Sequence, residues 1–132
     1  MTRVWVDANI LLRFITRDVP AQNSRVRSLM QRAADGDILL RIPSVVVAEV
    51  VWVLASAYKL DRRTIAGTLR ELAIADGIEI EEQDVVLDAL RLMESANVAY
   101  VDAYLAAKAR RHGEPVLTFD SDFRRLDVEL FA

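Results

Sequence analysis

Acidic side chains stand at the positions of this sequence where metal-assisted chemistry needs them. Each lies at the end of an apolar segment or within one: Asp7, Glu49, Asp102 and Asp120. The chain has no cysteine and a single histidine, His112, so a metal site must be built from oxygen ligands. Carboxylates are the ligands that Mg²⁺ and Mn²⁺ prefer, and such ions polarise phosphoryl oxygens and activate water. The acids therefore point to phosphodiester hydrolysis without a protein nucleophile.

Two of these aspartates are expected to meet at one edge of a sheet. Asp7 follows an expected strand at residues 3–6, and Asp120 follows another at residues 116–119. Because the carboxyl ends of parallel strands lie along the same sheet edge, the two carboxylates should converge. Aspartate is also a good helix N-cap, worth about 1 kcal/mol, and this alternative applies to Asp7, to Asp120 and above all to Asp102.

Glu49 is different, because it lies in the middle of an expected helix rich in valine and cannot be a cap. Burying an unpaired carboxylate costs several kcal/mol, so we expect Glu49 to meet a cation, to be protonated or to face a cleft. A salt bridge with an arginine is the alternative to metal ligation. Since converging carboxylates repel one another, at least one of the four acids should have a raised pKa.

Apolar periodicity and capping residues predict that strands and helices alternate. Strands are expected at residues 3–6, 38–40, 78–80, 115–119 and 128–131, and helices after Asp7, before Gly36, at 45–58, after Asp61, around 86–93 and at 102–111. Ser44 and Asp61 are expected N-caps, Gly113 is an expected helix stop, and Trp5 and Trp52 are expected in the core. The alternation predicts an α/β sandwich around a parallel sheet.

The composition fits one domain spanning residues 1–132, since 53% of the residues are hydrophobic. A net charge of -3 gives no general attraction for nucleic acid, so local arginines or bound cations would have to hold a polyanion. The N-terminus lacks the apolar stretch of about 7 to 15 residues of a signal peptide. The longest apolar stretch, residues 42–57, is too short and interrupted to cross a membrane. We therefore expect a cytoplasmic protein.

Motifs along nearly the entire chain resemble the PIN-domain ribonucleases and, within them, the VapC-type toxins of toxin–antitoxin pairs. They are VWVDANILL at residues 4–12, PSVVVAEV at 43–50, VDAYLAA at 101–107 and LTFDSDF at 117–123. Each motif is weak by itself, whereas their order and spacing together are fairly specific. The resemblance implies a three-layer sandwich with a mostly parallel five-stranded sheet flanked by helices.

The resemblance also implies a Mg²⁺ site, in which Mn²⁺ can substitute, at the four acids named above, and RNA cleavage by metal-activated water. Asp122 matches a further candidate metal ligand, and Asn9 and Thr118 match supporting positions. Ala8 departs from the family pattern, which often has a threonine or serine there, and the missing hydroxyl could loosen the orientation of Asp7. The implied partners are RNA, a cognate antitoxin and a second copy in a homodimer.

Other interpretations are weaker. A phosphatase of the haloacid-dehalogenase type would need an aspartate where Asn9 stands, and the glycines cannot form a phosphate-binding loop. The open alternative is a catalytically silent PIN fold that binds RNA or a protein. Retention of all four acids argues against that alternative.

Overall fold

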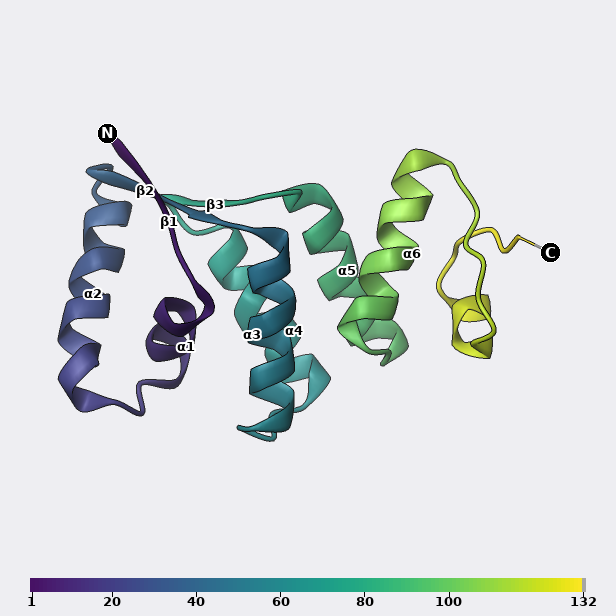
Figure 1. The fold of residues 1–132 in the computed structure, drawn as a ribbon, viewed down its shortest axis with the longest axis horizontal. Coiled ribbons are helices and arrows are strands. Elements are labelled where there is room, and N and C mark those ends of the chain that lie inside the picture. Colours follow the sequence, from purple (N-terminus) through teal and green to yellow (C-terminus); the bar gives the residue numbers. More distant parts are fainter. Residues whose placement is uncertain (132) are drawn as a thin grey trace.

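The computed structural model describes residues 1–131, in which strands and helices alternate (Figure 1). The strands are β1 (Thr2–Trp5), β2 (Ile38–Ile42) and β3 (Ile78–Ile80). The helices are α1 (Ala8–Thr16), α2 (Pro20–Ala34), α3 (Ser44–Ser56), α4 (Arg62–Ala73), α5 (Gln83–Ala96) and α6 (Tyr100–His112), followed by a 3₁₀ helix at Ser121–Arg125. The expected α/β alternation is confirmed as far as α6.

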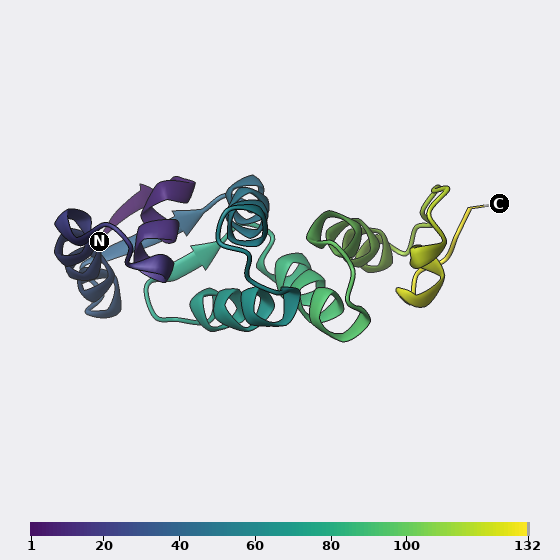
Figure 2. The same ribbon diagram turned by 90° about the horizontal axis from the view of Figure 1, so that it is seen from below.

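The strands form a parallel sheet in the order β1-β2-β3, with Val4 opposite Leu40 and Leu40 opposite Ile78. Helices make the crossovers that connect these parallel strands. The molecule is elongated: the sheet and α1 to α4 fill one end, α5 and α6 follow, and the 3₁₀ helix lies at the other end (Figures 1 and 2). Strand β1 is therefore an edge strand, far from the C-terminal residues.

The expected five-stranded sheet is wrong for the described residues, because the two C-terminal strands do not join it. Residues 113–131, here called the C-terminal arm, instead contain one isolated parallel bridge between Val116 and Leu130. Three apolar side chains of the arm are buried, namely Val116, Phe123 and Leu126, and they anchor it away from β1. Arg125 also donates to the backbone oxygen of Ala96 at the end of α5. The arm is thus packed onto the end of the molecule opposite β1.

The helix ends agree only partly with their expected caps. Asp61 caps α4 by accepting the backbone N–H of Thr64 at 2.7 Å, and Gly113 ends α6 with a left-handed φ of 66°. Ser44 is not a cap: it is the first residue of α3, whose N-cap is Pro43. Its side chain is therefore available for a contact with another element.

Both tryptophans lie at the surface, so their expected place in the core is wrong. Trp5 is 57% exposed because β1 is an edge strand, although the Arg41 guanidinium lies 4.9 Å from its ring centre. Trp52 is 69% exposed because α3 buries its opposite face, which carries Val50 and Leu54. Because α3 is apolar on nearly all sides, its sequence does not reveal which of its faces is covered.

In the part of the chain that the structure describes, we find no helix with both the length and the apolar character needed to cross a membrane.

Candidate active site

Asp7 lies between β1 and α1, where it is the N-cap of α1. Its Oδ1 accepts the backbone N–H of Ile10 at 3.1 Å, which fixes the carboxylate at the start of α1. The capping interpretation is therefore confirmed for the local contact. The residue is nevertheless exposed, so capping leaves the carboxylate accessible to a ligand.

Glu49 is exposed on α3, which overturns the expectation that it is buried. The helix turns Val47, Val50 and Leu54 inward and leaves Glu49 on its uncovered side. Within residues 1–131, no arginine or lysine forms an ion pair with Glu49. The alternative of a structural salt bridge therefore has no support, and the carboxylate is open to a partner from outside.

Asp102 lies in the first turn of α6, and it is not the N-cap, because the helix begins at Tyr100 after Ala99. The side chain is half-buried, and this burial is the main reason that the pKa of its carboxyl is raised. The negative charges of Asp120 and Asp122 raise this pKa further. The pKa of one acid is raised as expected, but burial rather than the convergence of four carboxylates is the main cause, and Asp102 lies within electrostatic reach of the acidic turn.

That acidic turn is organised by its own hydrogen bonds. Asp120 Oδ1 accepts the backbone N–H of Asp122 at 2.8 Å and so caps the 3₁₀ helix. The backbone N–H of Asp120 donates to Thr118 Oγ1 at 2.9 Å. Arg125 lies 3.4 Å from Asp122 Oδ1 in a partly exposed ion pair. A cation and two carboxylates thus share one short turn.

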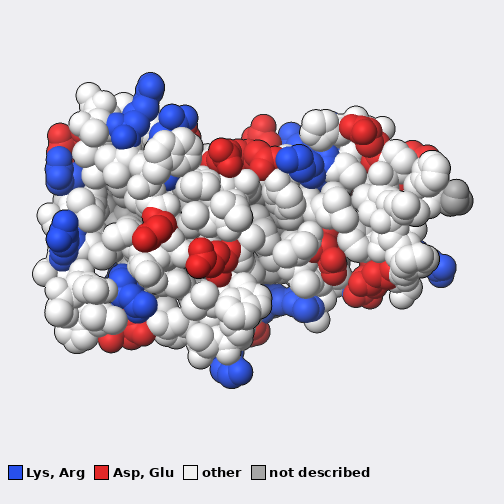
Figure 3. All heavy atoms as spheres, viewed as in Figure 1, with Lys and Arg blue, Asp and Glu red and all other residues white. Residues whose placement is uncertain are grey.

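The four acids do not converge within one chain. Asp7 and Glu49 belong to the end of the molecule that carries the sheet, whereas Asp120 and Asp122 belong to the C-terminal arm. Acidic side chains appear over this face as separate patches (Figure 3). No group of three or more metal-binding side chains that could hold an ion is found among residues 1–131. A single chain in this arrangement does not fit the expected metal ion.

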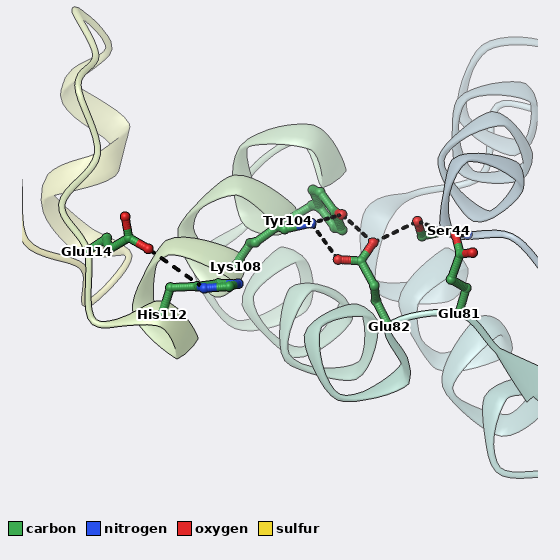
Figure 4. Close-up of polar contacts among 7 residues, drawn as sticks. All are labelled: Ser44, Glu81, Glu82, Tyr104, Lys108, His112 and Glu114. Atoms are coloured by element: carbon green, nitrogen blue, oxygen red, sulfur yellow. Dashed lines mark hydrogen bonds and ion pairs between the residues drawn. The ribbon is translucent and has the colours of Figure 1, made fainter.

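A polar network that the sequence did not predict joins α3, α5 and α6 (Figure 4). Glu82, just before α5, accepts hydrogen bonds from Lys108 Nζ at 2.6 Å, Tyr104 OH at 2.7 Å and Ser44 Oγ at 2.8 Å. These bonds, that of Lys108 foremost, lower the pKa of the Glu82 carboxyl to about 2. The network fixes α6 relative to α3 and α5.

No local pattern in the sequence could have revealed this network. Its members are far apart along the chain: Glu82 follows Ser44 by 38 positions, and Lys108 follows Glu82 by 26. Glu82 has a left-handed φ of 57°, which is unusual for a residue other than glycine and which a propensity argument does not anticipate. Only the packing of three helices brings these side chains together.

The structure is thus a parallel α/β domain in which exposed aspartates stand at the starts of helices. The family model for the PIN domain matches residues 4–129. The chain belongs to the PIN domain family, whose members are generally nucleases and therefore hydrolases. A search of curated proteins found no match. The resemblance drawn from the four motifs is thus confirmed at the level of the family.

Proposed function

We propose that this chain is a divalent-metal-dependent endoribonuclease that uses Asp7, Glu49, Asp102 and Asp120, which lie apart in the single chain and must be brought together by a second molecule or a rearrangement. The observation that carries the proposal is the presence of all four acids in a chain whose family match spans residues 4–129. Mg²⁺ is the proposed ion and Mn²⁺ its substitute, since both prefer carboxylate oxygens. Bound there, the ion would supply an activated water and charge neutralisation for phosphodiester hydrolysis.

The electrostatics around Asp102 support this proposal. Burial raises its pKa most, two neighbouring carboxylates raise it further, and a cation placed among them would relieve that repulsion. The charge of Arg62 lowers the same pKa. Arginines near an acidic site can also hold RNA phosphates, which suits Arg62 and Arg125.

We also propose, from the resemblance to VapC-type proteins, that the chain is the toxin of a toxin–antitoxin pair. An antitoxin segment that brings a basic side chain to the exposed carboxylates of Asp7 and Glu49 would inhibit it. A small gene for a DNA-binding protein beside the gene for this chain would support that role. The alternative of a silent binding module predicts RNA or protein binding without cleavage.

Cleavage assays test the enzymatic proposal directly. Purified protein should cut single-stranded RNA in Mg²⁺ or Mn²⁺, stop when EDTA is added and resume when Mg²⁺ is restored in excess. Undiminished cutting in EDTA would contradict the metal requirement. RNA binding without any cutting in either metal, measured by gel shift on the same preparation, would favour the silent module.

A further inference from the structure

Strand β1 presents an open edge to solvent. The backbone N–H of Val6 donates to Arg41 O of β2 at 3.1 Å. Because neighbouring residues of a strand direct their backbone groups to opposite sides, Arg3 and Trp5 direct theirs away from β2. No strand pairs with that side among residues 1–131, and all four residues of β1 are exposed. An exposed apolar edge strand is a template for another strand.

The C-terminal arm carries a segment, residues 115–119, that has one isolated bridge at Val116 and uncovered apolar side chains at Leu117 and Phe119. The backbone N–H and C=O of Val116 are both bonded to residues 129–131, so Leu117 directs its own backbone groups to the other side. The side chain of Leu117 is 77% exposed and that of Phe119 is fully exposed. Residues 115–119 therefore offer an unpaired edge and an apolar surface, as β1 does.

The arm cannot reach β1 of its own chain without losing the contacts that hold it. Phe123 and Leu126 are buried, and Asp127 forms an ion pair with Arg110 of α6 at 3.1 Å. Helix α6 is in turn fixed to α3 and α5 through Glu82 (Figure 4). β1 and the arm lie at opposite ends of the molecule in both views (Figures 1 and 2).

We infer that the arm of one copy adds to β1 of a second copy as a parallel fourth strand, in a symmetric dimer that exchanges both arms. A second copy supplies an arm segment for the open edge of β1 and a β1 edge for the open arm segment, and the packing of each arm on its own chain is kept. Two identical contacts related by a twofold axis close the assembly and leave neither edge exposed. This is strand addition, in which main-chain hydrogen bonds join the partners.

The exchange would also complete the acidic site, a step that rests on the proposed function. Parallel addition places Asp120, at the carboxyl end of the arm segment, beside Asp7, at the carboxyl end of β1. Asp102 stays with Asp120, because α6 carries Asp102 and is joined to the arm by the ion pair between Arg110 and Asp127. Each site would then contain Asp7 and Glu49 from one copy and Asp102 and Asp120 from the other.

Cross-linking tests the exchange independently of activity. Because the sequence has no cysteine, only the introduced cysteines can react with the cross-linker. Val4 and Leu117 each lie three residues before their aspartate, so parallel addition should bring them close. The double variant Val4→Cys/Leu117→Cys, treated with a short bis-maleimide, should run as a covalent dimer on a denaturing gel. Ile74→Cys/Leu117→Cys is the matched control, since Ile74 is exposed but lies outside β1; it should remain monomeric.

Three results would overturn the inference. A monomer linked within one chain, identified by its mass, would show that the arm reaches its own β1. Absence of any link would show that the two segments do not meet. A dimer of equal yield from the control pair would show random collision.

Complementation of inactive variants then tests the composite site. Co-expressed Asp7→Asn and Asp120→Asn chains should recover about a quarter of wild-type cleavage, because half of the dimers are mixed and each mixed dimer has one intact site. Asp7→Asn with Glu49→Gln should recover none, because both acids belong to the same half-site. Recovery in neither mixture, with the cross-linked dimer present, would reject the shared site while leaving the strand exchange in place. If wild-type protein also fails to cut, the proposed function fails separately.

Discussion

Asp7→Asn should lower RNA cleavage by about 100-fold or more while leaving the melting temperature almost unchanged. Asp7 caps α1 in the structure and is also proposed to bind the metal ion, and the substitution affects only the second role. Asparagine can accept the backbone N–H of Ile10 and cap α1 as aspartate does, but it does not carry the negative charge. Cleavage assays and thermal unfolding of the same preparation measure the two effects.

Alanine and a second cap provide the controls. Asp7→Ala should lose cleavage equally and also cost about 1 kcal/mol, a drop in melting temperature of roughly 3 to 5 degrees. Asp61 caps α4 in the same way, with Thr64 N–H at 2.7 Å, but lies outside the proposed site. Asp61→Ala should therefore be destabilised similarly and still cut RNA. Full cleavage by Asp7→Asn would contradict the role of Asp7.

Glu82→Gln should destabilise the protein at neutral pH by about 2 kcal/mol. The folded-state pKa of Glu82 is lowered from 4.5 to about 2, a shift worth roughly 3 kcal/mol before solvent screening is considered. The side chain is 27% exposed, and we discount the figure for that reason. A lowered pKa stabilises the fold above pH 4.5, and this contribution disappears as pH falls towards 2.

Acid titration of stability checks the sign of this effect. Between pH 4.5 and 2 the free energy of unfolding should fall less in the variant than in the wild type. Some fall should remain, because the pKa of Asp18 is also lowered to about 2, chiefly by its hydrogen bond from Tyr58. Glu114→Gln removes an equal charge from an exposed ion pair with His112 at 3.7 Å and should change little. Equal effects of both substitutions would show that net charge, not the network, is responsible.

Local signals in the sequence were sufficient for most of the elements. Three short strands and the helices with apolar stripes appear where periodicity and caps predicted them, as Asp61 and Gly113 illustrate for the helices. The acids at the ends of those elements could also be identified, since chain order fixes which residue follows which strand. Asp7 and Asp120 stand at element boundaries as expected.

Features that depend on packing between distant segments could not be predicted in this way. The covered side of α3 decides whether Glu49 is buried, and its nearly uniform apolar sequence does not encode that choice. The place of residues 115–119 depends on where Phe123 and Leu126 find their apolar contacts. A strand-forming sequence specifies that pairing is possible, but not which edge provides the partner.

The distance between β1 and the C-terminal arm has a kinetic consequence under the exchange that we propose. An isolated chain would carry two half-sites and no whole one, so catalysis would be second order in protein when chains are dilute. Specific activity would rise in proportion to concentration until most chains are paired, and then level off. While the chains are dilute, total cleavage would therefore rise with the square of their concentration, so a small amount of protein would cut RNA much less efficiently per chain than a large amount.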